Sequence, residues 1–216
     1  MKLAWCGLFA VAVSGQTLNS SAVNQNVNCV SGCSSPAIPV TYSWQTPDAV
    51  AGASKLFADL FNASGSGKVL KILGVHPLVK GDAAVVGALA IRFDLYRTSA
   101  VGTGGTAAAY KSATIDVAGG SIHPRDTANA ALPAQVTARH LPTGGATISE
   151  WMERFQCFTE ETNAATYFCN GQSNFVYDGL LAIQPITLRE GQGLLIKQGT
   201  VASLNNIAFK VVFSVE

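Results

Sequence analysis

Charged side chains are scarce in this chain. Lysine and arginine total 14 and aspartate and glutamate total 13 among 216 residues, so 12% of the chain is charged, about half of the roughly 25% usual for a soluble domain. A formal net charge of +1 provides no basic surface for a phosphate backbone, which argues against direct nucleic-acid binding. The 48% hydrophobic content argues against disorder, because disordered segments combine low hydrophobicity with high net charge. We therefore expect a folded chain that hides part of its surface against neighbouring subunits.

Long apolar runs are also missing. Mean hydropathy is positive, at +0.27, but no uninterrupted apolar stretch approaches the roughly 20 residues that a membrane-spanning helix needs. A length of 216 residues fits one domain with an arm and would be cramped for two full domains. We therefore predict one folded domain and no membrane span.

The N-terminal segment Met1–Gly15 (MKLAWCGLFAVAVSG) has two interpretations. A lysine, an apolar stretch and two small residues resemble a short secretory signal, and cleavage there would place the protein outside the cell. The alternative, which we favour, is an apolar arm that packs onto the body or onto a neighbour. Residues 17–35 follow without periodicity and are rich in Asn, Ser and Gln, which is typical of an extended linker. We therefore divide the chain into an arm with its linker, residues 1–35, and a folded domain, residues 36–216.

The cysteines form an odd set of five: Cys6, Cys29, Cys33, Cys157 and Cys169. Cys29 and Cys33 are close enough in sequence to bridge a loop, and Cys157 with Cys169 is suited to bridging two adjacent strands in an oxidising compartment. A zinc site would need CxxC-type pairs or nearby histidines, and no histidine neighbours a cysteine. We expect buried thiols or one structural disulfide, and no metal or other cofactor.

Several segments have the composition and period of short β-strands. Hydrophobic residues alternate with more polar ones in residues 89–96 and again in residues 207–215, so each segment is predicted to be a strand with one face in a core. Residues 54–61 fit a helix or a strand, but the turn-like NASGSG after them favours a strand entering a hairpin, with Lys68–Val75 returning. The other predicted strands are Val40–Trp44, Tyr110–Asp116, Glu150–Phe158, Thr166–Cys169, Leu180–Ile183 and Leu194–Lys197.

The connections between these segments are rich in Gly and Pro. Residues 119–145 are predicted to be one long loop, and long loops in compact domains usually serve a contact. Residues 150–158 also fit a helix, but no long helical period occurs anywhere. Eight or more short strands with Gly and Pro turns indicate an all-β fold, an antiparallel β-sandwich. A jelly roll is the topology we expect.

Motifs that specify a catalytic chemistry are absent. The segment NASGSGK, residues 62–68, lacks the first glycine of a phosphate-binding loop, and a strand rather than a helix is predicted after it. The glycine-rich residues 101–106 (VGTGGT) likewise precede no helix. No G-x-S-x-G nucleophile elbow occurs. We therefore expect a protein that is not an enzyme.

His123, Arg125 and Asp126 lie together in the predicted long loop (HPRD). Catalysis would need a nucleophile and an orienting partner that the spacing does not supply, so we interpret Asp126 as a residue that caps its own backbone and pairs with a neighbour's arginine. Four glutamates between residues 150 and 161 surround Arg154, and this pattern is typical of a solvated face.

Exposed aromatic residues beside polar groups would indicate a sugar-binding surface. Trp44, Trp151, Tyr167 and Tyr177 are available for such a surface. Burial in a core or an interface is equally consistent with each of them. The sequence leaves both interpretations open.

The order of several turn-and-strand segments resembles a known group of proteins. These segments are Leu60–Ile72 (LFNASGSGKVLKI), Ala88–Ala107, His123–Arg139 (HPRDTANAALPAQVTAR), Thr143–Thr147 (TGGAT) and Pro185–Thr200 (PITLREGQGLLIKQGT). Together they resemble small virion proteins of tailed bacteriophages and environmental viral sequences, over about residues 56–216. The resemblance implies a β-sandwich structural protein of a virion rather than an enzyme.

Low charge, an apolar arm and a long loop favour the same role, because each suits packing among subunits. We expect a capsid decoration (cement) or minor capsid subunit on the virion surface that binds between major capsid proteins and forms a homotrimer. The residues expected to make contacts are Trp5 and Phe9 in the arm and His123, Arg125 and Asp126 in the loop. Two alternatives remain: a receptor- or glycan-binding head of a phage tail or fibre, and a secreted bacterial filament or surface-layer subunit.

Overall fold

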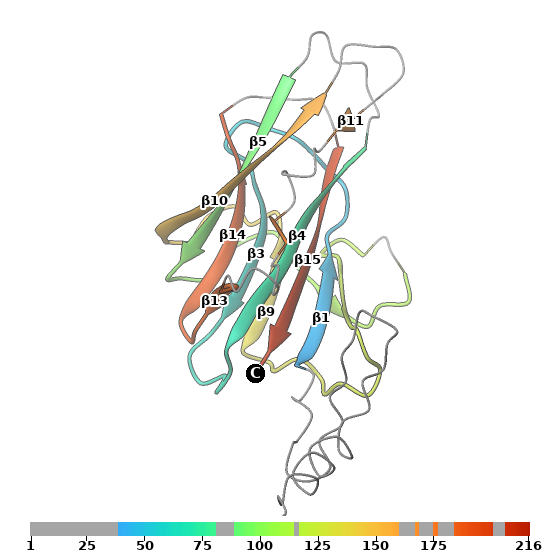
Figure 1. The fold of residues 1–216 in the computed structure, drawn as a ribbon, viewed down its shortest axis with the longest axis vertical. Helices are drawn as coiled ribbons and strands as arrows, with labels where there is room; N and C mark the ends of the chain where they lie inside the picture. The colour runs from blue at the N-terminus through green and yellow to red at the C-terminus, as the bar shows by residue number, and fades with distance from the viewer. Residues whose placement is uncertain are drawn as a thin grey trace, which may run out of the picture. The chain divides into compact units, whose positions relative to one another are not determined.

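The computed structural model describes residues 39–80, 89–114, 117–159, 167–168, 175–176, 184–200 and 206–216. Residues from Pro39 to the C-terminus form one compact unit. Within the described residues this unit is entirely β-structure, with turns between the strands (Figure 1). The predicted arm, with Trp5 and Phe9, lies outside the described residues, as does the predicted strand Leu180–Ile183.

The described strands form two sheets. Sheet A contains β1 (Val40–Gln45), β2 (Ala49–Val50), β4 (Leu70–Lys80), β7 (Ala109–Tyr110), β8 (Ser121–Pro124), β12 (Phe175–Val176), β13 (Ile186–Leu188) and β15 (Asn206–Val215). Sheet B contains β3 (Leu56–Asn62), β5 (Leu89–Thr98), β6 (Thr106–Ala107), β9 (Val136–His140), β10 (Ile148–Thr159), β11 (Tyr167–Phe168) and β14 (Gln192–Gln198). Every pairing that the structure describes is antiparallel except β7 with β8, which is parallel.

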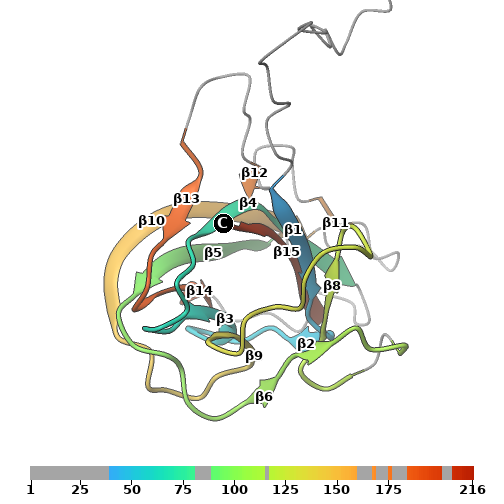
Figure 2. The ribbon, with the colours of Figure 1, turned by 90° about the horizontal axis from the view of Figure 1, so that it is seen from below.

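The four longest strands pair with one another within their sheets, β4 with β15 in sheet A and β10 with β5 in sheet B. Sheet A runs β12-β4-β15-β1-β8-β7, with β13 beside β4 and β2 beside β15, and sheet B runs β11-β10-β5-β14-β3-β9-β6. Figure 2 shows β4, β15 and β1 on one side of the core and β5, β14 and β3 on the other. The predicted antiparallel β-sandwich is therefore confirmed.

The core forms where the alternating hydrophobic faces of the two sheets meet. In β5, Ile91, Phe93 and Leu95 are fully buried, as are Phe209 and Phe213 in β15, which is the face that the period of two predicts. Four phenylalanines form the centre, with ring centroids of contacting pairs 5.1–6.3 Å apart: Phe57, Phe93, Phe155 and Phe209. Aromatic pairs of this kind contribute about 0.5–1.5 kcal/mol each beyond the area that they bury.

The predicted hairpin at NASGSG is wrong, because β3 and β4 belong to different sheets. Both sides of β3 are already occupied, by β14 and β9, so the returning strand has no free edge to pair with and crosses to sheet A. Gly65 and Gly67 adopt positive φ values of 83° and 62° in this turn. Their N–H groups donate to the carboxylate of Glu190 at 3.2 and 2.5 Å, which lowers the pKa of that side chain. The turn thus binds the chain's own carboxylate.

The predicted long loop is also wrong in part, because residues 119–145 contain β8 and β9. In β9, Val136, Ala138 and His140 are buried, so the strand follows a period of two that its polar and basic residues conceal in the sequence. The strand predicted at Tyr110–Asp116 is shorter than expected: β7 ends at Tyr110, and residues 111–114 are not strand. Residues 150–158 lie within strand β10, so the helical alternative is wrong for this segment.

Candidate functional site

The three loop residues expected to make contacts lie beside the edge of sheet A. His123 is exposed on β8, and its Nε2 lies 2.8 Å from the hydroxyl of Ser121. The backbone N–H of Arg125 donates to the carbonyl of Thr41 at 2.8 Å. Asp126 accepts a hydrogen bond from the N–H of Ala128 at 2.9 Å, which is the backbone-capping role expected for it. No described ion pair includes Arg125 or Asp126, and whether they contact a partner stays a prediction.

Cys157 is fully buried on β10 and is disulfide-bonded. The other cysteines in the predicted pairings, Cys29, Cys33 and Cys169, lie outside the described residues. The pairing of Cys157 with Cys169 therefore stays a prediction.

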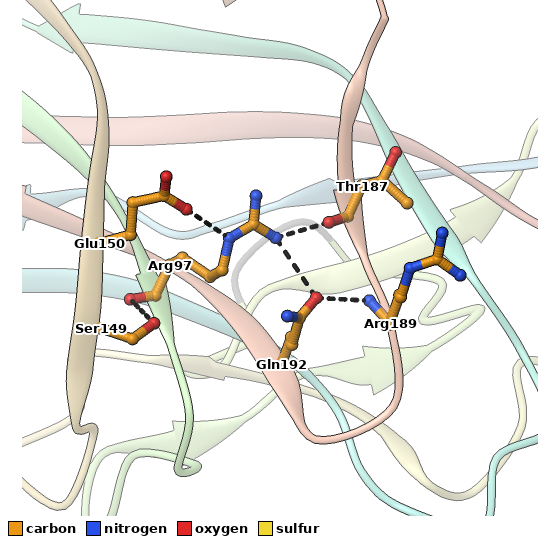
Figure 3. Close-up of polar contacts among 6 residues, drawn as sticks. All are labelled: Arg97, Ser149, Glu150, Thr187, Arg189 and Gln192. Carbon is orange, nitrogen blue, oxygen red and sulfur yellow. Dashed lines mark hydrogen bonds and ion pairs between the residues drawn. The ribbon is translucent and has the colours of Figure 1, made fainter.

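Of the glutamates between residues 150 and 161, one described member forms an ion pair and another faces solvent. Glu150 accepts a 2.8 Å hydrogen bond from Nε of Arg97, and Glu153 is exposed. The Arg97 guanidinium also donates at 2.6 Å to the carbonyl of Thr187 and at 3.3 Å to the side chain of Gln192 (Figure 3). Because Thr187 is on β13 of sheet A and Arg97 is on β5 of sheet B, this group connects the two sheets. Its role is structural.

The tryptophans occupy opposite environments. Trp44 is fully buried, and its indole N–H donates to the carbonyl of Gly119 at 3.2 Å. Trp151 is 54% exposed on the outer face of sheet B, the highest exposure among the large hydrophobic residues of the described part. Tyr167 lies in β11, and Tyr177 lies outside the described residues. Of these four aromatic residues, Trp151 is the one whose side chain the structure shows to be exposed.

Trp151 belongs to a polar group on sheet B that we call the Asp94 site. Its members come from three adjacent strands: Arg92, Asp94 and Tyr96 on β5, Trp151 and Arg154 on β10, and Lys197 on β14. In register, Asp94 is opposite Arg154 on one side and Lys197 on the other, and Tyr96 is opposite Trp151.

A β-bulge brings Trp151 and Arg154 to the same face. Residues three apart in a regular strand point to opposite faces, but the register of β10 shifts between Trp151 and Glu153. As a result, the indole N–H of Trp151 and the guanidinium of Arg154 both donate to Asp94, the latter at 2.6 and 3.1 Å and the former at 3.2 Å. The bulge thus builds the site.

Asp94 is the anchor of this group. Its side chain is only 6% exposed, whereas that of Arg154 is 50% exposed. Burial alone would raise the pKa of Asp94, but the hydrogen bonds from Arg154 and Trp151 outweigh burial and lower its pKa below the ordinary value. Asp94 therefore stays ionised and holds both the guanidinium and the indole in place. The Arg154 guanidinium lies 6.0 Å from the centre of the Trp151 ring, within cation–π range.

A depression of about 260 Å³ adjoins Asp94 and Arg154. It is lined by Ser54, Arg92, Asp94, Tyr96, Arg154, Lys197, Gln198, Gly199 and Thr200. Three cations and one carboxylate face it, and Arg154 already neutralises that carboxylate. No side-chain hydrogen bond or ion pair joins Arg92 or Lys197 to another described residue.

Two further titratable groups are buried in sheet B. Asp59 is 1% exposed; its Oδ2 accepts the N–H of Gly102 at 2.7 Å and its Oδ1 has no hydrogen-bond partner. Burial raises the pKa of Asp59 to about 6, against the lowering effects of Gly102 and Arg139. His140 is 4% exposed, and burial lowers its pKa; Nδ1 lies 3.2 Å from the carbonyl of Ala118, so this nitrogen carries the proton.

These buried groups do not form a recognisable reaction centre. Asp59 and Arg139 are cross-strand neighbours, but no described ion pair joins them. In the described part of the chain, no three His, Cys, Asp or Glu side chains come close enough together to hold a metal ion. A search of the same residues finds no helix that is long and apolar enough to cross a membrane.

The sequence alone predicts only some of the residues of the Asp94 site. The alternation in β5 identifies Arg92, Asp94 and Tyr96 as one polar face, and Trp151 is a candidate aromatic. Nothing in the sequence indicates the bulge in β10 or the register that places Lys197 opposite Asp94. Comparisons with protein-family models, with curated proteins and with solved structures gave no match for this chain.

Proposed function

We propose that this chain is a non-enzymatic structural protein of a virion, a capsid decoration or minor capsid subunit that binds between major capsid proteins. The proposal includes a jelly-roll topology, a homotrimeric state and a position on the capsid surface. The resemblance of its turn-and-strand segments to virion proteins of tailed phages suggested this role, and two features of the fold support it.

The first feature is the strand order. When the eight strands β1, β3, β4, β5, β10, β12, β14 and β15 are numbered in chain order, sheet A reads 6-3-8-1 and sheet B reads 5-4-7-2. This order supports the proposed jelly roll, in which two Greek keys interleave across the two sheets. Jelly rolls are frequent in viral capsid proteins and in lectins, so the order supports a role in assembly or recognition.

The second feature, which carries the proposal, is the distribution of acidic residues between the strands of the two sheets. None of the described strands of sheet A contains Asp or Glu, whereas sheet B contains Asp59, Asp94, Glu150 and Glu153. Val50 and Leu78 are 52% and 41% exposed on β2 and β4 of sheet A. They lie beside Asn206 and Ala208 of β15, two positions that share the outer face. Another subunit can cover this face without desolvating a carboxylate on a strand. Desolvation of a carboxylate would cost free energy and weaken the contact.

The test compares two matched substitutions to glutamate. Leu78→Glu places a carboxylate on sheet A, and Ile148→Glu places one on sheet B at a residue of similar exposure, 43%. We expect Leu78→Glu to lower incorporation into purified source particles by roughly tenfold or more, because burial of an unpaired carboxylate opposes docking. Incorporation is measured by quantitative mass spectrometry, and both variants are first checked for an unchanged melting temperature.

Ile148→Glu should incorporate at the wild-type level. Normal occupancy of Leu78→Glu would contradict the proposed role of sheet A. Cryo-electron microscopy of the same particles then locates the chain: density between capsomers agrees with the capsid role, and density at a tail tip or on a free filament overturns it.

A further inference from the structure

The Asp94 site has the features of a small binding site on the sheet opposite the proposed capsid-facing one. Its depression is lined by residues of β5 and β14 and by Arg154 of β10 in sheet B, together with Ser54, Gly199 and Thr200 from the connecting segments. A volume of about 260 Å³ is slightly below the range of roughly 300–1,000 Å³ that drug-sized ligands occupy. The site is thus of a size for a single small ring.

The charge of the depression indicates an anionic ligand. Arg92 and Lys197 face it with donors that no described side chain satisfies, while Asp94 is fully engaged by Arg154 and Trp151. A planar carboxylate between an arginine and a lysine would form charge-assisted hydrogen bonds with both. A long polyanion is a poor fit, because only three cations gather here and the chain carries a net charge of +1.

Trp151 indicates that the anion is carried by a sugar ring. Its indole is more than half exposed, yet its N–H is fixed to Asp94, so the ring is a preorganised platform rather than a mobile surface side chain. Trp151 does not itself line the depression, but it lies beside two residues that do, Asp94 and Arg154. The apolar C–H face of a pyranose packs on such a ring, while its hydroxyls can reach Ser54 and Thr200 of the depression.

We propose that the Asp94 site binds a carboxylated pyranose, with the carboxylate between Arg92 and Lys197 and the ring directed toward Trp151 beside the depression. A sialic acid and a uronic acid both have this chemistry. The site goes beyond the capsid role, and because it lies on sheet B it does not depend on the contacts proposed for sheet A.

The test uses the full chain and three soluble sugars: sialyllactose, a glucuronic acid–N-acetylglucosamine disaccharide, and lactose as the uncharged control. Binding is measured by isothermal titration calorimetry and by the shift of tryptophan fluorescence. We expect one or both acidic sugars to bind with a dissociation constant at or below about 1 mM and lactose to bind at least tenfold more weakly. Whichever acidic sugar binds more tightly identifies the kind of sugar that supplies the carboxylate.

Substitutions then locate the binding site. Arg92→Gln and Lys197→Met are surface changes that should preserve the fold, and each should weaken binding of the acidic sugar by roughly tenfold or more. Trp151→Ala should weaken it similarly and remove the fluorescence shift. Arg125→Gln, which changes another exposed arginine beside sheet A, is the matched control and should leave the dissociation constant unchanged.

The proposal is overturned if neither acidic sugar binds at about 10 mM, a concentration that would detect even very weak sites. It is equally overturned if lactose binds as tightly as the acidic sugars, or if Arg92→Gln and Lys197→Met weaken binding no more than Arg125→Gln does.

Discussion

At the scale of single residues, the buried carboxyl of Asp59 is the feature with the clearest consequence for stability. It lies on β3 between strands β14 and β9, accepts the N–H of Gly102, and has a second oxygen without a hydrogen-bond partner. Burial raises its pKa from 3.8 to about 6, so the folded protein holds a proton there at pH values at which the unfolded chain has lost it.

The resulting pH dependence is opposite to that of a paired carboxylate. Between about pH 4 and pH 6 the folded state binds more protons at Asp59 than the unfolded state does, so the free energy of unfolding falls as the pH rises through this window. The difference of about 2 units corresponds to a loss of about 3 kcal/mol. Asp59→Asn should not show this loss, because an amide does not titrate.

The measurement is chemical denaturation of wild type and Asp59→Asn at intervals from pH 4 to pH 7. The stability of the variant relative to wild type should increase as the pH rises. His140, whose pKa is lowered by burial, destabilises both proteins at acidic pH and cancels in this difference. A difference that stays constant across the range would contradict the raised pKa of Asp59.

At the scale of elements, polar contacts between strands hold the sandwich together at one end. The guanidinium of Arg97 lies between β10, β13 and β14, so it links sheet B to the carbonyl of Thr187 in sheet A (Figure 3). Its side chain is 21% exposed, whereas that of its ion-pair partner Glu150 is 59% exposed. The bond to Thr187 should therefore matter more than the ion pair.

Two substitutions separate these contributions. Arg97→Met should lower the free energy of unfolding by about 2–3 kcal/mol, because it removes charge-assisted hydrogen bonds to partners from both sheets. Glu150→Gln should cost less than about 1 kcal/mol, since exposed ion pairs are weak. Both values are obtained from urea unfolding followed by circular dichroism. Equal losses in the two variants would mean that the connection between the sheets contributes nothing beyond the surface pair.

At the scale of the whole molecule, the two sheets differ in chemistry. Sheet A carries no acidic residue in its described strands, whereas sheet B carries the Asp94 site and the buried Asp59. In our two proposals, sheet A faces a neighbouring subunit and sheet B remains available for a ligand. The disulfide of Cys157 lies on β10 of sheet B, the strand that also contributes Trp151 and Arg154.

That disulfide should stabilise the whole domain. Loss of a native disulfide from a small domain typically costs about 2–4 kcal/mol, and Cys157→Ala should lower the free energy of unfolding by about this amount under oxidising conditions. Most of the difference from wild type should disappear when a reductant is added to both proteins. Peptide mapping by mass spectrometry identifies the partner, which we expect to be Cys169. A free thiol at Cys157 in the purified native protein would contradict this prediction.

The sequence by itself determined the class of fold and the central strands. The alternation in β5 and β15 dictates which residues enter the core, because a strand turns successive side chains to opposite faces whatever its neighbours are. The same alternation identified Arg92, Asp94 and Tyr96 as one polar face. Trp151 was one of four aromatic candidates for a sugar-binding surface. No feature of the neighbouring sequence indicates that its side chain is exposed.

Only the tertiary structure decided which strands are neighbours. The NASGSG turn has the composition of a hairpin, yet β3 and β4 enter different sheets, because β14 and β9 occupy both edges of β3. Likewise Asp94, Arg154 and Lys197 come from segments as far apart as residues 94 and 197 and meet through strand register and one bulge. Pairing between distant strands depends on the packing of the whole sandwich, so local composition cannot specify it.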